Sequence, residues 1–83
     1  MKWLEIFSQR LLELRKNRNW TQEEASIECG MPFRTYRRYE TGEREPQVSS
    51  FVKIADTYQV SLDYLAGRTD DPKFEGKSNQ AEH

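Results

Sequence analysis

The sequence predicts an all-α protein, a compact domain of five short helices. Apolar residues recur at spacings of three and four along most of the chain, which is the periodicity of helices that bury one face. No segment alternates apolar and polar residues as a strand does, and residues typical of helix ends separate the periodic segments. A length of 83 residues allows one small core and leaves no room for a second.

The first two predicted helices are separated by a short turn. Residues 1–18 form the first helix, whose apolar residues lie at helical spacing: Leu4, Phe7, Leu11 and Leu14. The second helix begins after Thr21, which is followed three residues later by Glu24, the capping box that satisfies the first free amides of a helix. It ends at Gly30, because glycine readily adopts the positive φ at which helices stop.

Three more helices follow along the chain. Pro32 fits the first position of the third helix, where its missing N–H costs nothing, and no breaker follows before Gly42. The fourth helix is indicated by the spacing of Val48, Phe51, Val52, Ile54 and Ala55. Ser61 caps a short fifth helix. The folded domain is therefore expected over residues 1–68, and the polar residues 69–83 are expected to form a disordered tail.

Composition argues against several classes of function. The single cysteine, Cys29, and the single histidine, His83, leave no disulfide framework and no metal cluster, and no cofactor is expected. An enzyme is not expected, because the chain has no nucleophile with an evident base and no glycine-rich phosphate loop. No apolar run is long enough for a membrane span or a signal peptide, so the cytoplasm is the expected location.

The second and third predicted helices have the spacing of a helix-turn-helix, since the turn between them has three or four residues and contains Gly30. At about 100° per residue, the third helix has two opposite faces. One face carries Phe33, Arg34, Arg37 and Arg38, and the other carries Thr35, Tyr36 and Tyr39. If the tyrosines pack into the core, the arginines must project into solvent.

The exposed arginines give a nearly neutral chain a local positive surface. A net charge of -1 argues by itself against a nucleic-acid partner. Residues 32–41, however, contain three arginines and only Glu40 as an acid. An arginine fork donates two hydrogen bonds to O6 and N7 of guanine in the major groove, and Phe33 is suited to contact with a thymine methyl group. This context favours DNA recognition over a merely solubilising helix face.

Several separated motifs occur in the order found in a known family. They are Thr21-Gln22-Glu23-Glu24-Ala25, Thr35-Tyr36-Arg37-Arg38-Tyr39-Glu40-Thr41-Gly42, Arg44-Glu45-Pro46, Ile54-Ala55-Asp56 and Val60-Ser61-Leu62-Asp63-Tyr64-Leu65-Ala66-Gly67-Arg68. Over residues 7–68 the chain thereby resembles the phage repressor and Cro-type helix-turn-helix family, also called the XRE family. The resemblance implies a compact five-helix, lambda-repressor-like domain that acts as a sequence-specific transcriptional regulator by placing its third helix in the major groove.

The resemblance also implies roles for individual residues. Base contacts are implied for Phe33, Arg34, Arg37 and Arg38. Phosphate contacts are implied for Thr21, Gln22, Thr41 and Arg44. Arg15 and Glu40 occupy the positions of a structural ion pair that orients the third helix. Three positions depart from the family pattern. Pro32 stands where serine or threonine usually caps the third helix. Ala25 stands where leucine commonly packs and Ser26 where alanine is frequent, so either the core is looser there or Trp20 and the tyrosines fill the space.

The implied partner is a palindromic or pseudopalindromic double-stranded DNA operator bound by a homodimer, because one recognition helix covers only a few base pairs. The expected regulator is a repressor of bacterial or phage origin, cytoplasmic and associated with the nucleoid, with no membrane contact and no small-molecule ligand. Trp3 and Ile6 lie off the apolar stripe of the first helix, and they either cover the end of the fifth helix or form a dimer contact. The alternative function is a protein-interaction module, an antitoxin or adaptor on the same fold, that binds a protein through these two residues or the tail.

Overall fold

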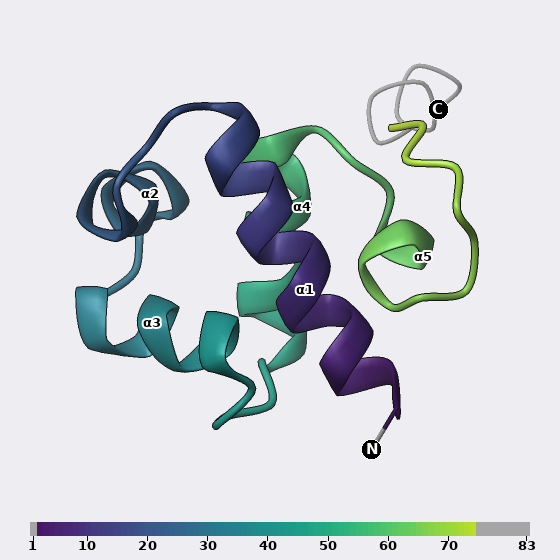
Figure 1. The fold of residues 1–83 in the computed structure, drawn as a ribbon, viewed down its shortest axis with the longest axis horizontal. Helices are drawn as coiled ribbons and strands as arrows, with labels where there is room; N and C mark the ends of the chain where they lie inside the picture. Colours follow the sequence, from purple (N-terminus) through teal and green to yellow (C-terminus); the bar gives the residue numbers. More distant parts are fainter. Residues whose placement is uncertain (1, 75–83) are drawn as a thin grey trace.

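The computed structural model describes residues 2–74, which contain five α-helices joined by short connections (Figure 1). They are α1 (Lys2–Asn17), α2 (Gln22–Cys29), α3 (Phe33–Thr41), α4 (Val48–Tyr58) and α5 (Leu62–Leu65). Residues 2–74 contain no strand, so the predicted all-α fold with five helices is confirmed. None of these helices combines the length and the apolar character that crossing a bilayer requires.

The predicted helix ends are present, with one correction. Thr21 Oγ1 accepts a hydrogen bond from Glu24 N at 3.1 Å, and a Glu24 carboxylate oxygen accepts one from Thr21 N at 2.8 Å, which completes the capping box. Gly30 adopts a φ of 71° and ends α2. Pro32, however, is the cap of α3 and not its first helical residue. Its ψ of 146° is extended, although its carbonyl accepts the first bond of the helix, from Tyr36 N at 3.0 Å.

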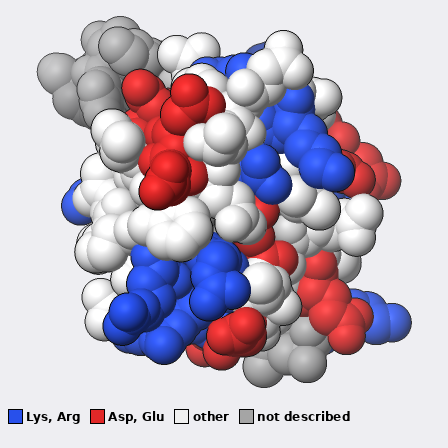
Figure 2. All heavy atoms as spheres, turned by 60° about the vertical axis from the view of Figure 1, so that its left-hand side comes forward, with Lys and Arg blue, Asp and Glu red and all other residues white. Residues whose placement is uncertain are grey.

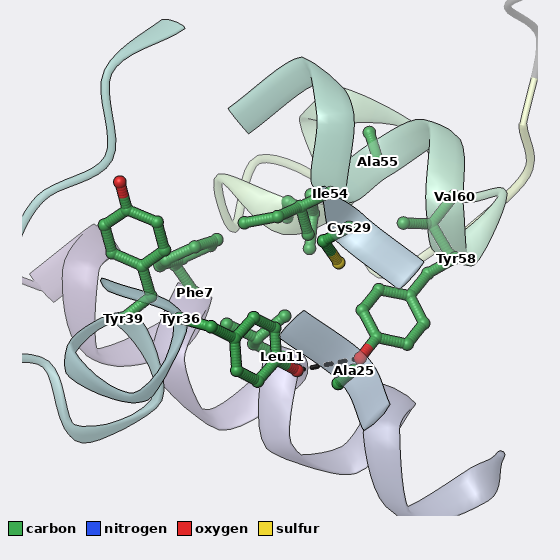
Figure 3. Packing of buried hydrophobic residues seen from close by; sticks show 11 residues of the cluster. Phe7, Leu11, Ala25, Cys29, Tyr36, Tyr39, Ile54, Ala55, Tyr58 and Val60 are labelled. Carbon is green, nitrogen blue, oxygen red and sulfur yellow. Dashed lines mark hydrogen bonds between the residues drawn. The ribbon is translucent and has the colours of Figure 1, made fainter. Parts of the chain in front are cut away.

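All five helices contribute to the core, which is rich in aromatic rings (Figure 3). Its buried members are Phe7, Leu11, Ala25, Cys29, Tyr36, Tyr39, Ile54, Ala55, Tyr58, Val60 and Leu65. The ring of Phe7 contacts those of Tyr39 and Phe51, at centroid distances of 6.2 and 5.4 Å. Edge-on and tilted contacts of this kind add to the free energy gained by burial. Cys29 is buried and packs in this core as a small apolar residue.

A pair of hydrogen-bonded tyrosines joins α3 and α4 in the core. Tyr36 Oη and Tyr58 Oη form a hydrogen bond of 2.7 Å in the core, and Figure 3 shows Ala25 next to this bond. The ring of Trp20 packs on that of Tyr58 at a centroid distance of 5.6 Å. Ala25 is 0% exposed, so its small side chain is fully enclosed by its neighbours.

Trp3 and Ile6 both pack within the chain. Trp3 contacts the rings of Phe7 and Phe51, each at a centroid distance of 6.0 Å. Ile6 covers the turn after α5, where a Cβ on Gly67 would come within 2.9 Å of Ile6 Cδ1. Gly67 also has a φ of 81°, so both its backbone conformation and its surroundings require glycine.

The segment after Arg68 contacts the helices over its first residues. Arg10 donates hydrogen bonds to the carbonyl oxygens of Tyr64 and of Thr69, the latter at 2.7 Å, and pairs with the Asp70 carboxylate at 2.7 Å. Ser61 N donates to the carbonyl oxygen of Pro72 at 3.1 Å. The packed structure therefore continues past the boundary expected at Arg68. The remainder of the expected tail, residues 75–83, lies outside the described residues.

The buried hydroxyl and thiol groups make stability sensitive to alkaline pH. Burial raises the pKa of Cys29 to about 11 and that of Tyr58 to about 12, and it also raises the pKa of Tyr36. The unfolded chain loses these protons from about pH 8.5 for cysteine and pH 10 for tyrosine. Above these values the folded state holds more protons than the unfolded state, so the free energy of unfolding must fall as pH rises.

Urea denaturation between pH 7 and pH 11 measures this dependence. We expect a constant free energy of unfolding up to about pH 8.5 and a steady fall above it. The variant Cys29→Ala should move the onset of the fall toward about pH 10, because only the tyrosines then remain to titrate. An unfolding free energy that stays constant to pH 11 would show that these groups ionise freely in the folded state.

Candidate nucleic-acid interface

The helix-turn-helix consists of α2, a turn of residues 30–32 and α3. Met31 N donates to the carbonyl oxygen of Ser26 at 3.0 Å, and Gly30 N donates to that of Ile27 at 3.0 Å, so the turn satisfies two carbonyls in the last turn of α2. A Cβ on Gly30 would meet no atom within 4 Å. Glycine is therefore required there for its positive φ, and the turn directs the chain into α3 at the lower left of Figure 1.

The two faces of α3 are separated as the sequence predicts. Tyr36 and Tyr39 are 0% and 2% exposed and belong to the core, and Thr35 is half-buried. The opposite face, called the arginine face below, is exposed and carries Phe33, Arg34, Arg37 and Arg38. Figure 2 shows a compact blue patch over this part of the molecule, although the whole chain has a net charge of -1. The positive surface is thus local and is built by one helix.

The arginines of this face are available to an external acceptor. Within residues 2–74, the ion pairs involve Arg10, Arg15 and Arg68, and no carboxylate is paired with an arginine of the exposed α3 face. Nor do the described residues after α5 cover this face, because they pack against Arg10 and Ser61. The three guanidinium groups therefore retain their hydrogen-bond donors for a ligand.

The residues expected to contact phosphate lie at the ends of the two helices. Thr21 is exposed at the start of α2, where its hydroxyl oxygen is used in the capping box. Thr41 is exposed at the end of α3 and donates to the carbonyl oxygen of Arg38 at 3.1 Å. Arg44 is exposed in the loop between α3 and α4. These positions flank the arginine face at both ends of the helix-turn-helix.

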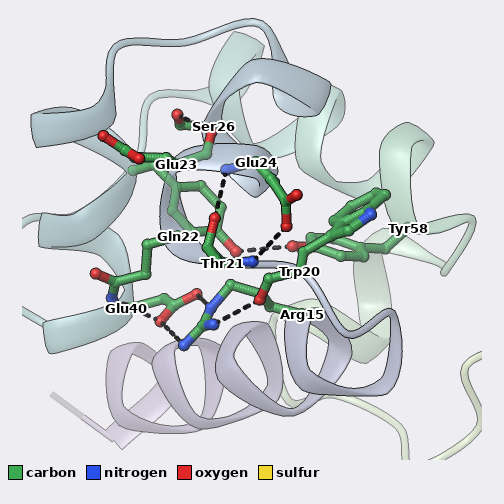
Figure 4. A network of polar contacts seen from close by, with 10 residues as sticks. Arg15, Trp20, Thr21, Gln22, Glu23, Glu24, Ser26, Glu40 and Tyr58 are labelled. Carbon is green, nitrogen blue, oxygen red and sulfur yellow. Dashed lines mark hydrogen bonds and ion pairs between the residues drawn. The ribbon is translucent and has the colours of Figure 1, made fainter.

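Arg15 and Glu40 form the ion pair that the family resemblance implies (Figure 4). Arg15 Nε lies 2.6 Å from Glu40 Oε2, and Arg15 Nη2 lies 3.2 Å from Oε1, which is a bidentate arrangement. A third donor, Arg15 Nη1, reaches the carbonyl oxygen of Trp20 at 2.9 Å. The hydrogen bond to Glu40 raises the pKa of Arg15. One guanidinium therefore joins α1, the segment before α2 and the end of α3.

Gln22 also belongs to this network, a role that the sequence did not reveal. Its amide Nε2 donates to Glu40 Oε1 at 3.0 Å, so the first residue of α2 is tied directly to α3. The two residues are 18 positions apart, and no local pattern connects them. Because an amide nitrogen carries two protons, Gln22 keeps one donor for a further partner. The network thus fixes the position of α3 relative to both preceding helices.

Removal of one partner from this network should destabilise the fold strongly. The side chain of Glu40 is 3% exposed, so the variant Arg15→Ala leaves a buried carboxylate without its cation. We expect a loss of ~3–5 kcal/mol in the free energy of unfolding, measured by urea denaturation at pH 7. The variant Gln22→Ala should cost less, ~0.5–1.5 kcal/mol, because the ion pair remains. A loss below about 1 kcal/mol for Arg15→Ala would mean that water replaces the guanidinium at no great cost.

A helix-turn-helix family model matches residues 11–65. The cryptic phage CTXphi transcriptional repressor RstR of Vibrio cholerae is 42% identical over 60 residues, which are 72% of this chain and 54% of RstR. The uncharacterized HTH-type transcriptional regulator YobD of Bacillus subtilis is 37% identical over 67 residues, 81% of this chain and 60% of YobD. The HTH-type transcriptional regulator AnsR of Bacillus subtilis is 37% identical over 59 residues, 71% of this chain and 51% of AnsR.

The chain thus spans 51% to 60% of the lengths of these three curated relatives. No solved structure gives a significant match. The family model covers well over half of the chain, and it includes α2, the turn and α3 with their exposed arginines. The chain therefore belongs to the phage repressor and Cro-type helix-turn-helix family.

Proposed function

We propose that this chain is a sequence-specific DNA-binding domain of a transcriptional regulator, a repressor that inserts α3 into the major groove of its operator. The observation that carries the proposal is the separation of faces on α3. Tyr36 and Tyr39 are buried, and the exposed face presents Phe33 and three arginines that no described carboxylate neutralises. A major groove about 12 Å wide admits such a helix.

The exposed face of α3 supplies the base contacts in this proposal. Arg34, Arg37 and Arg38 each present a planar fork that donates two hydrogen bonds to O6 and N7 of guanine. Phe33, at the first position of α3, lies where recognition helices approach base edges most closely. The rigid attachment of α3 through Glu40 keeps these side chains in one register on the duplex.

Residues at the helix ends supply the phosphate contacts. The amides at the start of α2 favour an anion, and Thr21 and the second amide proton of Gln22 lie at that end. Thr41 and Arg44 would contact the sugar-phosphate backbone of the DNA beyond the other end of α3. Contacts of this kind position the protein on the duplex, whereas contacts to base edges determine sequence preference.

The proposed complex is a homodimer on a palindromic or pseudopalindromic operator, because one recognition helix covers too few base pairs for a selective site. Two half-sites about one helical turn apart would place both copies on one face of the DNA. The name of RstR, a transcriptional repressor, supports repression as the outcome. In this proposal the protein acts in the cytoplasm, where the operator is located, and neither a catalytic step nor a small-molecule ligand takes part.

Variants of the arginine face should lose both affinity and base preference. Arg34→Ala and Arg38→Ala are each expected to cost ~1–3 kcal/mol in binding and to relax preference at one position of the site. The measurement is selection of duplexes from a random pool, followed by fluorescence anisotropy with the enriched duplex and its single-base variants. Wild-type protein should enrich a palindromic consensus. If it enriches no consensus at all, the proposed function is wrong.

Arg44→Ala should behave differently, since Arg44 is assigned to phosphate. We expect weaker binding to all duplexes alike and a slope of log affinity against log salt that is smaller by about one. Lys16→Ala is the charge-matched control, because Lys16 is an exposed cation in the last turn of α1. If Arg44→Ala and Arg38→Ala changed base preference to the same extent, the division between base and phosphate contacts would be refuted.

A further inference from the structure

The side chain of Phe33 is exposed on the arginine face and does not take part in the packing of the core. It is 42% exposed, and among the exposed large apolar residues of the described part it is the one aromatic residue. The ring contacts within residues 2–74 connect Trp3, Phe7, Tyr39, Phe51, Trp20 and Tyr58, and Phe33 is not among them. The ring is therefore free to contact a ligand, and its removal should leave the core intact.

Arg37 is the helical neighbour of Phe33. The two residues are four positions apart on α3, so their Cβ atoms lie about 5–6 Å from each other on the same face. Arg37 is exposed, and no carboxylate of residues 2–74 forms an ion pair with it. The first turn of the exposed face thus presents an apolar ring next to a guanidinium group.

A particular arrangement of bases complements this pair. The major-groove edge of thymine carries a 5-methyl group, which favours an apolar partner, and the edge of guanine offers two acceptors to an arginine fork. Consecutive bases of a strand are separated by about 3.4 Å, a distance that the long Arg37 side chain can span from its position beside Phe33. 5-Methylcytosine presents the same methyl group at the same place in the groove.

We propose, on the basis of the function proposed above, that Phe33 and Arg37 together recognise a 5-methylpyrimidine in the base pair next to a guanine. Phe33 covers the methyl group, and Arg37 binds O6 and N7 of the guanine. Thymine satisfies this requirement in unmodified DNA. Cytosine satisfies it only after methylation at C5, so binding to a site with cytosine at this position responds to the methylation state of the DNA.

The expected effect of one methyl group is modest but measurable. Burial of a group of this size corresponds to about a fourfold change in affinity. In a symmetric operator the same contact occurs in both half-sites, so replacement at both positions should change affinity about sixteenfold. These changes are well within the resolution of an anisotropy titration.

The test uses the duplex that the full chain enriches most from a random pool. Each thymine is replaced singly by uracil, which removes only the methyl group. In each half-site we expect one thymine whose replacement weakens wild-type binding about fourfold. Placing cytosine or 5-methylcytosine at that position, opposite guanine, should give a similar ratio in favour of the methylated base. The adjacent base pair should contain a guanine whose replacement by 7-deazaguanine, which lacks the N7 acceptor, also weakens binding.

Two variants assign these effects to the proposed side chains. Phe33→Ala should bind the thymine and uracil duplexes equally and should fold normally, as judged by its circular dichroism and melting temperature. Arg37→Ala should lose the response to 7-deazaguanine and keep the response to uracil. Ile27→Ala is the matched control, because Ile27 is an apolar residue of α2 that is 74% exposed, and it should retain both responses.

The outcomes separate this inference from the proposed function. If a consensus is enriched but uracil replacement has no effect at any position, the methyl contact is refuted while DNA recognition stands. The same conclusion follows if Phe33→Ala still distinguishes thymine from uracil. If the sensitive thymine has no guanine in the next base pair, the pairing of Phe33 with Arg37 is refuted. The absence of any enriched duplex would instead refute the proposed function itself.

Discussion

The carboxylate of Glu40 is buried where α1, α2 and α3 meet, and it must be neutralised there. A buried charge is tolerated only when partners take up its hydrogen-bonding capacity, and Glu40 accepts bonds from Arg15 and from Gln22. Arg15 also binds the carbonyl oxygen of Trp20, so the same network holds the segment that leads into α2. Because this arrangement has few geometric alternatives, it fixes the position of α3 relative to the rest of the domain.

The position of α3 in turn determines its exposed chemistry. With Tyr36 and Tyr39 held in the core, the helix can present only one face to solvent, and that face carries three arginines and a phenylalanine. The hydrogen bond between Tyr36 in α3 and Tyr58 in α4 helps to hold α3 in the orientation that exposes this face. A chain with a net charge of -1 thereby acquires a local positive surface on α3. Charge distribution, more than total charge, determines which partner such a domain attracts.

Features that depend on neighbouring residues were predictable from the sequence. The capping box at Thr21, the stop at Gly30 and the two faces of α3 each follow from residues within a few positions of one another. Sequence patterns did not reveal the bond from Gln22 to Glu40, the tyrosine pair or the contacts of Arg10 with residues 64–70, because these join positions 18 to 60 apart. The pairing of Arg15 with Glu40 was expected only because the chain resembles a family. The start of α3 was predicted at Pro32, one residue too early, since the extended ψ of Pro32 was not evident from the sequence.

The most direct test of the account is the solvent exchange of the arginine side-chain Nε–H groups, measured by NMR on nitrogen-15-labelled protein with and without duplex DNA. In free protein, the Nε–H of Arg15 should exchange slowly, because it is bonded to Glu40, while those of Arg34, Arg37 and Arg38 exchange fast. Addition of the duplex that the protein enriches from a random pool should slow exchange at the three α3 arginines and leave Arg15 unchanged. The account would be contradicted if the α3 arginines were already protected in free protein, or if DNA left their exchange unaltered.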